Sequence, residues 1–357
     1  YELKKQGFEA FLVGGCVRDY LMHIEPQDID ITTNAKPFEV AKIFTTKPTG
    51  IQYGTVTVLF KDESFEVTTY RIDDAYTDNR HPSGITYTQS VEDDVQRRDF
   101  TINGLLMNEK LEVIDYVGGK KDIEAKMIQT IGDPKARFDE DALRMLRAFY
   151  FQAKLGFQID KETRNAISNQ KEALKTISNE RVRTELIKML KQKHVKKAIH
   201  TLIQTGVHEV LPGLKQGILH VQTLEEMPFV DSFFTLCFTL NGSVPSEWTF
   251  SNKHKHLYQT ASMLANQVKH FDAEVLYTYG LEISLLANKV QFLLGKSTNQ
   301  KRKIEESYAN LPIQSEMDLK LRSSEIISIV NKKPGAWLSQ LVQRMVLMVL
   351  RKELKKV

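Results

Sequence analysis

Near its start the 357-residue chain reads Leu12-Val13-Gly14-Gly15-Cys16-Val17-Arg18-Asp19. The residues before the two glycines are typical of a β-strand, and those from Val17 to Met22 of a helix. Glycines at such a turn let backbone N–H groups approach a phosphate closely, and the start of a helix adds a partial positive charge. Many strand-to-helix turns use glycine merely to turn. The segment therefore predicts a strand, a turn and a helix, and leaves phosphate binding open.

A pair of carboxylates follows at Asp28-Ile29-Asp30, in a segment that is typical of a β-strand. Alternate residues of a strand lie on one face, so we expect the two aspartates to point the same way. Proteins bind Mg²⁺ with one or two carboxylates plus substrate phosphates, and two such ions can hold an attacking and a leaving oxygen. The simpler alternative is two solvent-facing aspartates on an edge strand. Glu66, between apolar residues of a later predicted strand, is either a third carboxylate of the site or an exposed strand residue.

The pattern of apolar residues divides the chain into a β-rich and a helical part. Up to about Ile131, short runs typical of strands alternate with helical ones. The predicted strands are Phe11 to Val13, Asp28 to Thr32, Thr55 to Phe60, Phe65 to Tyr70 and Val113 to Tyr116. From Asp139 onward the pattern predicts long amphipathic helices, at Asp141 to Leu155, Glu180 to Lys193 and Leu338 to Lys356. The fold class is therefore α+β, with candidate boundaries at Pro134, Pro212-Gly213, Pro245 and Pro312.

Composition excludes several classes of protein. The chain is 41% hydrophobic and 26% charged, as in ordinary globular proteins, and its longest apolar runs are far too short to span a bilayer. Cys16 and Cys237 are too few for a disulfide framework, and no secretory signal pattern is present, so we expect a cytoplasmic protein. Residues 281–357 carry 14 Lys and Arg against 7 Asp and Glu. That basic region indicates either a polyanionic partner or a solvated helical surface.

Further segments give the chain a family resemblance. The order Gly14-Gly15, Asp28-Ile29-Asp30 and Glu66 resembles the nucleotidyltransferase superfamily that includes DNA polymerase beta. Four more segments resemble the class II CCA-adding enzymes and the related bacterial poly(A) polymerases. They are Arg97-Arg98-Asp99-Phe100-Thr101-Ile102-Asn103, Asp115-Tyr116-Val117-Gly118-Gly119, Glu140-Asp141-Ala142-Leu143-Arg144-Met145-Leu146-Arg147 and Glu180-Arg181-Val182-Arg183-Thr184-Glu185-Leu186. The chain departs from the family at Gly104-Leu105, where Ala-Met is common, and the resemblance fades after about residue 215, apart from Pro334 to Leu338.

The resemblance implies a fold and an activity. The expected parts are a catalytic head with a small mixed sheet (1–137), a helical neck that recognises the base (138–195), a helical body (196–280) and a basic helical tail that binds tRNA (281–357). The implied reaction adds C, C and A to the 3′ end of tRNA from CTP and ATP, with two Mg²⁺ ions held by Asp28 and Asp30. No obligatory protein partner is evident. A poly(A) polymerase and, less readily, an RNA-binding protein with a decayed active site remain as alternatives.

The resemblance also assigns roles to residues. It places Arg98 on the phosphates and Asp99 on the ribose, and an amide such as Asn103 can bind ribose hydroxyls. The triphosphate would also be held by the turn and helix around Gly14, Gly15 and Arg18. Arg147, at the end of the segment from Glu140 to Arg147, is a further candidate nucleotide-binding residue. The bland alternative for residues 97–103 is a surface salt bridge with a helix N-cap at Asp99 or Thr101.

Asp141 and Arg144 are the expected readers of the base. Three residues apart on a helix that starts near Asp139, they would share a face, and an ordinary ion pair between them would explain the spacing. The resemblance instead makes them an amino-acid template. An ionised Asp only accepts hydrogen bonds and an Arg only donates them. Cytosine and adenine both present an amino donor beside a ring-nitrogen acceptor, so this pair admits CTP and ATP and rejects GTP and UTP.

Two remaining segments add to this interpretation. Residues 71–95 form a polar stretch that is too irregular for a strand or helix, and it resembles the flexible loop, around Tyr76 to Gly84, of enzymes that add the terminal A. It favours complete CCA addition over CC addition. The lysine-rich segment from Lys188 to His200 either lines an RNA backbone or is a solvated helix face.

Overall fold

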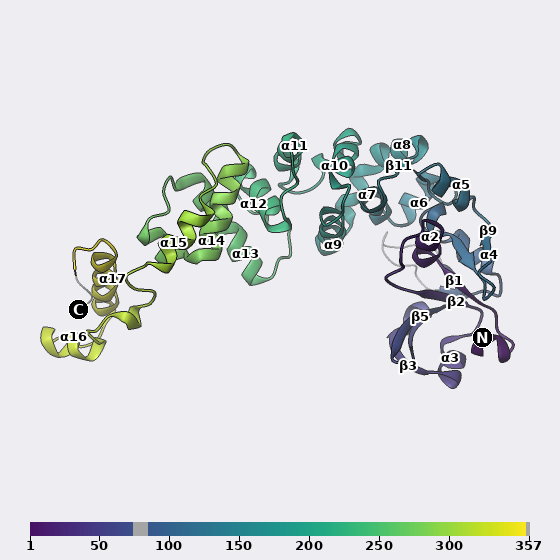
Figure 1. The fold of residues 1–357 in the computed structure, drawn as a ribbon, viewed down its shortest axis with the longest axis horizontal. Coiled ribbons are helices and arrows are strands. Elements are labelled where there is room, and N and C mark those ends of the chain that lie inside the picture. Colours follow the sequence, from purple (N-terminus) through teal and green to yellow (C-terminus); the bar gives the residue numbers. More distant parts are fainter. Residues whose placement is uncertain (74–84, 355–357) are drawn as a thin grey trace. The chain divides into compact units, whose positions relative to one another are not determined.

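The computed structural model describes residues 1–73 and 85–354, and the chain forms two compact units, Tyr1–Leu211 and Pro212–Val357 (Figure 1). The division falls at the boundary that Pro212-Gly213 predicts. The first unit holds the mixed sheet together with helices, and the helices of the second unit begin at α11. The α+β class is thereby confirmed, while the finer division into four parts stays a prediction.

A seven-stranded sheet forms the centre of the first unit, in the order β3-β4-β5-β2-β1-β8-β9. Its strands are β1 (Ala10–Val13), β2 (Asp30–Thr33), β3 (Thr45–Gly50), β4 (Thr55–Phe60), β5 (Glu63–Thr69), β8 (Leu105–Met107) and β9 (Val113–Asp115). β2 and β5 pair in parallel, and the other neighbours in this sheet pair antiparallel. The five predicted strands are confirmed, and β3 and β8 are strands that the prediction missed.

Alternating apolar residues bury both faces of this sheet. One face of β1, β8 and β9 packs against helices α2 (Gly15–Leu21) and α5 (Gly119–Glu124), through residues such as Val17, Leu105 and Ile123. The opposite face packs against α4 (Val91–Gln96) through Val13, Val95 and Leu106. α1 (Glu2–Lys5) and α3 (Pro37–Ile43) cover the β2, β4 and β5 end. Ile31 and Val67 point into that last core, so Asp30 and Glu66, one residue away on each strand, point to the other face.

The segment Asp115-Tyr116-Val117-Gly118-Gly119 is a structural turn. Asp115 Oδ1 accepts hydrogen bonds from the backbone N–H groups of Val117 (3.1 Å), Gly118 (2.9 Å) and Gly119 (3.0 Å), and Oδ2 accepts one from Lys120 (2.9 Å). A Cβ on Gly119 would lie 2.2 Å from the carbonyl oxygen of Thr101. Only glycine therefore lets α5 pack directly on the turn at Thr101–Asn103.

Helices continue the first unit after the sheet. They are α6 (Pro134–Glu140), α7 (Leu143–Leu155), α8 (Lys161–Gln170), α9 (Asn179–Leu190) and α10 (Val195–Gln204). A two-residue strand, β11 (Gln158–Ile159), lies among these helices and pairs in parallel with β10 (Met127–Ile128). This short ladder joins the end of the head to the chain that follows α7.

Residues 71–95 are more regular than predicted. Arg71–Asp73 (β6) and Ile85–Tyr87 (β7) form an antiparallel pair, and α4 begins at Val91. Ser90 caps that helix by accepting a hydrogen bond from the N–H of Asp93. The central part of the predicted loop, Tyr76 to Gly84, lies outside the described residues.

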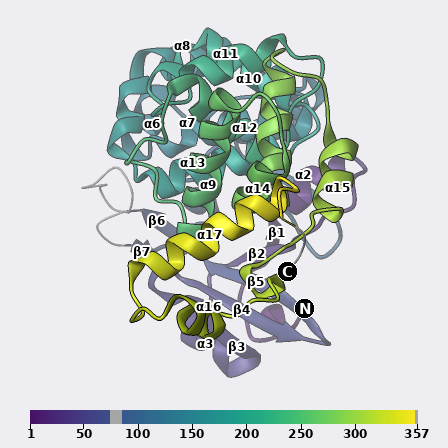
Figure 2. The same cartoon turned by 90° about the vertical axis from the view of Figure 1, so that its left-hand side faces the viewer.

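The second unit contains α11 (Lys215–Thr223), α12 (Val230–Asn241), α13 (Asn252–Gln267), α14 (Ala273–Leu293), α15 (Lys301–Ala309), α16 (Ser323–Val330) and α17 (Ala336–Leu350). Aromatic rings of α12, among them Phe234 and Phe238, pack with Phe250 and Tyr258 at centroid distances of 5.6 to 6.0 Å. α17, drawn in yellow in Figure 2, packs its buried valines against Ile313 and Ile326. Among the described residues no helix is long and apolar enough to cross a membrane.

Replacing Gly119 by alanine should destabilise the first unit. The added Cβ would collide with backbone rather than with a flexible side chain, so we expect a loss of about 1 to 3 kcal/mol in the free energy of unfolding. Urea titrations followed by circular dichroism measure the loss. Gly335→Ala is the control, because its Cβ would make an ordinary contact of 3.6 Å with Trp337. Equal, negligible effects of both substitutions would contradict the packing described for Gly119.

Candidate active site

Three carboxylates gather at the start of β2. Asp30 is the first residue of the strand and lies opposite Glu66 in the parallel β2–β5 ladder. Asp28 is exposed and precedes the strand in a bend, so the prediction that both aspartates belong to one strand is wrong for Asp28. Glu66, the least secure of the three from sequence, is thus placed directly beside Asp30.

The charges of these residues are suited to a cation. Burial raises the pKa of Asp30, the negative charges of Glu66 and Asp28 raise it further, and the guanidinium of Arg98 opposes them. Within residues 1–73 and 85–354, no group of three acidic, histidine or cysteine side chains is close enough to enclose a metal ion by itself. Mg²⁺ commonly takes only one or two carboxylates and completes its shell with phosphate and water. The donor set at Asp28 and Asp30 fits that requirement.

The diglycine turn lies next to Arg98. Gly14 has φ of +77°, a conformation that favours glycine, and it precedes the first turn of α2. A Cβ placed on Gly14 would lie 3.5 Å from Nη1 of Arg98. The other end of that guanidinium, Nη2, donates to Asp94 at 3.1 Å. A positive charge is thereby held beside the turn.

Arg18 is buried beneath the same turn, with 2% of its side chain exposed. Its guanidinium donates to Asp19 at 2.7 to 2.8 Å and to Oδ1 of Asn103 at 2.6 Å. Nη2 lies 3.7 Å from the position of a Cβ on Gly15. Arg18 therefore supplies a fixed charge below the turn and orients Asn103, a more indirect position than the sequence suggested for a phosphate ligand.

Asp99 joins the sheet to the helices. Its Oδ1 accepts from the amide nitrogen of Asn103 at 3.1 Å, and its Oδ2 accepts from Arg147 Nη2 at 2.6 Å. Burial alone would raise the pKa of Asp99, but Arg147 and the hydrogen bonds hold it below its usual range. The ring of Phe151 contacts both Arg18 and Arg147, whose guanidinium carbons lie 5.5 and 5.4 Å from its centre. Arg18, Asn103, Asp99 and Arg147 thus form a continuous chain of contacts.

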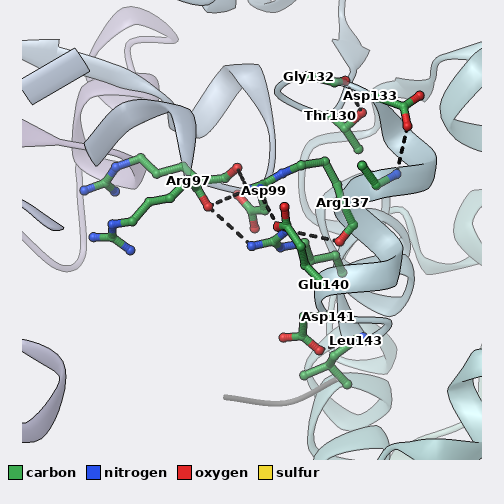
Figure 3. A network of polar contacts seen from close by, with 12 residues as sticks. Arg97, Asp99, Thr130, Gly132, Asp133, Arg137, Glu140, Asp141 and Leu143 are labelled. Carbon is green, nitrogen blue, oxygen red and sulfur yellow. Dashed lines mark hydrogen bonds and ion pairs between the residues drawn. The ribbon is translucent and has the colours of Figure 1, made fainter. Parts of the chain in front are cut away.

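Asp141 lies at the corner between α6 and α7 (Figure 3), and Arg144 is the second residue of α7. Asp141 has extended backbone, so it is not on the same helix as Arg144, contrary to the prediction. Asp141 accepts from the backbone N–H of Leu143 at 3.0 Å and from Arg181 at 2.9 Å. Arg144 is 7% exposed and donates to Glu140 and to the carbonyl oxygens of Arg137 and Arg97. Each residue is therefore held by other groups, in place of the simple ion pair between them.

Several residues that position this site were not among the predicted site residues. Arg137 is buried and donates to the carbonyl oxygens of Arg97 and Arg98 and to Glu140, which links α6 to residues 97–99 (Figure 3). Arg181 holds Asp141 from α9. Glu140 and Arg181 stand in segments quoted from the sequence, which is a signal for them. Asp94 and Arg137 lie among ordinary charged helix residues and carry no such signal.

Comparison with known proteins identifies the class. Residues 10–129 match the family model of the poly A polymerase head domain, and residues 156–218 match that of a probable RNA- and SrmB-binding site of polymerase A. Residues 232–356 match a putative domain 2 of tRNA nucleotidyltransferases, so similarity extends past residue 215, where the recognisable segments fade. Together with the carboxylates of β2 and β5, these matches define a nucleotidyltransferase.

Whole-chain relatives identify the family. The CCA-adding enzyme of Bacillus licheniformis is 38% identical, with 99% of this chain and 92% of the relative covered. That of Bacillus subtilis (strain 168) is 36% identical over 96% of this chain and 89% of the relative. The crystal structure of the Bacillus stearothermophilus CCA-adding enzyme in complex with CTP has a TM-score of 0.86 and 29% identity, covering 100% of this chain and 92% of that one. The chain belongs to the CCA-adding enzymes.

Removing the partner of Asp99 should destabilise the first unit in a pH-dependent way. In Arg147→Leu the buried carboxylate loses its counter-charge. Because a third of the Arg147 side chain is exposed, we expect a loss of about 2 kcal/mol at pH 7, less than the 3 to 5 kcal/mol of a fully buried pair.

The sign of the pH dependence follows from the pKa of Asp99. In the parent this pKa is lowered, so the pair stabilises the fold above about pH 4 and its contribution is lost as the pH falls below that. In the variant burial raises the pKa, and protonation at lower pH relieves the stranded charge. Urea titrations at several pH values should therefore show the gap between the proteins narrowing toward pH 4. A difference in the free energy of unfolding that is constant with pH contradicts this account. So does a difference that Asp99→Asn fails to reduce in the Arg147→Leu background.

Proposed function

We propose that this protein adds C, C and A in turn to the 3′ end of tRNA, using CTP and ATP without a nucleic-acid template and releasing pyrophosphate. The proposal combines the family of the chain with one observation. Asp141 and Arg144, one acceptor and one donor, lie three residues apart at the α6–α7 corner and are each fixed by separate neighbours. Solved structures of CCA-adding enzymes similar to this chain are described as complexes with CTP, with ATP and with tRNA.

The hydrogen-bonding capacity of these two residues supports base reading. The bonds of Arg144 to Arg137, Glu140 and Arg97 use three of the five N–H donors of a guanidinium. Asp141 accepts one bond on each oxygen, and a carboxylate has about four lone-pair sites. An acceptor and a donor thus remain for the amino group and the ring nitrogen of cytosine or adenine. Guanine and uracil reverse the order of donor and acceptor, because they present a carbonyl oxygen beside a ring N–H.

The rest of the nucleotide is held by residues of the head. Arg98 beside Gly14, with Arg18 below Gly15, provides positive charge for the triphosphate. Asp99 and Asn103, whose side chains are hydrogen-bonded to each other, would bind the ribose hydroxyls. Asp28 and Asp30, with Glu66 beside them, would hold two Mg²⁺ ions, which make the 3′-hydroxyl more acidic and neutralise the departing pyrophosphate.

In the reaction, the 3′-hydroxyl oxygen forms a bond to the α-phosphorus, and the bond from that phosphorus to the bridging oxygen of the β-phosphate breaks. The hydroxyl proton is lost and pyrophosphate leaves with the bonding electrons. The side chains bind and orient the two substrates, so no protein nucleophile is required. We assign the head, neck, body and tail to residues 1–137, 138–195, 196–280 and 281–357, and tRNA to the basic tail.

Incorporation of labelled CTP into tRNA lacking its 3′ end tests the proposed function. The parent should add CTP and then ATP in the presence of Mg²⁺, and sequenced product ends should read CCA. A poly(A) polymerase would prefer ATP and extend it repeatedly, and a binding protein would use neither nucleotide. Asp30→Ala should lower turnover by about a thousandfold or more, because several kcal/mol of charge stabilisation are lost. Its tRNA affinity in gel shifts should stay within about twofold, and near-parent turnover would remove the metal assignment.

Base selection gives a second test. In Asp141→Ala or Arg144→Ala one side of the base edge is unread, so the kcat/KM ratio for CTP over UTP should fall by about tenfold or more. Glu172→Ala is the matched control, because Glu172 forms an exposed i,i+3 ion pair with Lys175. It should leave the ratio unchanged. An unchanged ratio in both site variants, with native circular dichroism, would make Asp141 and Arg144 structural residues only.

A further inference from the structure

Asp94 is a fully buried carboxylate that the mechanism above does not use. It lies on α4, the helix that covers the same face of the sheet as Asp30, and it is 0% exposed. Its Oδ2 accepts from Thr32 Oγ1 (3.1 Å), on the strand that begins with Asp30, and from Arg98 Nη2 (3.1 Å). Its Oδ1 accepts from Arg97 Nε at 2.8 Å and from the backbone N–H of Arg71 at 3.4 Å. Asp94 is therefore hydrogen-bonded to four residues of the head, Thr32, Arg71, Arg97 and Arg98.

This carboxylate is held in its charged form. Burial would raise the pKa of Asp94, but the two guanidinium groups of Arg98 and Arg97 hold it below its usual range. One negative charge therefore faces two positive ones. Burying a charge is costly unless the charged group has a partner. A fully buried aspartate between two arginines is therefore unusual for an ordinary residue of a six-residue helix.

Arg98 has a second set of negative neighbours. Its Nη1 points to the Gly14 turn, and β1, which leads into that turn, pairs with β2, where Asp30 begins the strand. Arg98 is therefore bonded to Asp94 and lies close enough to Asp30 for its positive charge to act on that carboxylate. A guanidinium that lost its first partner would be attracted to the second, since opposite charges at close range favour contact.

We propose that Asp94 is a positioning residue that holds Arg98 at the diglycine turn and away from Asp28 and Asp30, so that these carboxylates remain available to the metal. The inference rests on the proposed function, because it gives Arg98 to the phosphates and the aspartates to Mg²⁺. Asp94 thereby prevents Arg98 from forming an ion pair with Asp28 or Asp30 before the substrate binds. The reaction needs both the positive charge of Arg98 and the negative charges of Asp28 and Asp30. Asp94 keeps these opposite charges from pairing with each other.

The test is a double-mutant cycle read by metal binding. Mn²⁺ is titrated into the full chain with an unreactive CTP analogue, and free Mn²⁺ is measured by electron paramagnetic resonance. Asp94→Asn should weaken Mn²⁺ binding by about tenfold, since Arg98 is then free to compete for the carboxylates. In the Arg98→Met background the same substitution should change Mn²⁺ binding by less than about twofold. An equal loss in both backgrounds, or no loss in either, overturns the proposal.

Two further variants separate charge from structure. Thr32→Val removes only a neutral hydrogen bond to Asp94 and leaves its ion pairs, so Mn²⁺ binding should stay within about twofold of the parent. A tenfold loss in Thr32→Val would mean that Asp94 matters only as a structural tie. Asp94→Glu keeps the charge and serves if Asp94→Asn does not fold. It should bind Mn²⁺ within about threefold of the parent, and a tenfold loss would contradict the proposal.

Failure of this inference can be distinguished from failure of the proposed function. Asp30→Ala must weaken Mn²⁺ binding if the assigned carboxylates hold the metal at all. If that variant binds Mn²⁺ as the parent does, the metal assignment under the proposed function is wrong. If Asp30→Ala binds weakly while the cycle shows no coupling between Asp94 and Arg98, only the role of Asp94 is wrong.

Discussion

The parallel pairing of β2 with β5 is the constraint on which the site depends. It sets Asp30 opposite Glu66, so two negative charges are fixed on one face of the sheet by backbone hydrogen bonds. A parallel pair cannot be joined by a tight turn, and the chain between the strands forms α3, β3 and β4, which extend the sheet and bury its other face. The negative charge of Glu66 beside Asp30 thus follows from the topology of the sheet, and the positive charge of Arg98 opposes its effect.

A second set of hydrogen bonds and ion pairs connects the sheet to the helices. Arg18 and Asn103 belong to the head, Arg147 belongs to α7, and Asp99 bonds to both Asn103 and Arg147. Arg137 adds a parallel connection from α6 to the backbone of residues 97 and 98. The groups that we propose for phosphate, ribose and base are therefore held in one continuous network of the first unit.

The sequence was informative where its pattern depends on local geometry. Alternation predicted β4 with its observed bounds, and the diglycine turn, the carboxylates and the helical residues from 143 to 155 were found from spacing and resemblance. β8 was missed because Leu105-Leu106-Met107 is buried on both faces and shows no alternation. β3 was missed because its residues are mostly exposed and include Pro48. Asp28 and Asp141 were placed on regular elements because spacing alone cannot show a bend or a helix that ends. The burial of Arg18 and Asp94 depends on partners far away in the sequence, which no local pattern reveals.

The short β10–β11 ladder has a consequence for how this protein can vary. Met127 pairs with Gln158 and Ile128 with Ile159, so both ends of the segment that contains α6 and α7 are fastened together. Inside this closed stretch lie Asp141, Arg144 and Arg147, whose partners are Arg181, Glu140 and Asp99. A residue inserted or deleted within α6 or α7 would rotate the rest of that helix by about 100° and turn these side chains away from their partners. Within α6 and α7 a change of side chain therefore disturbs this network less than a change in the number of residues.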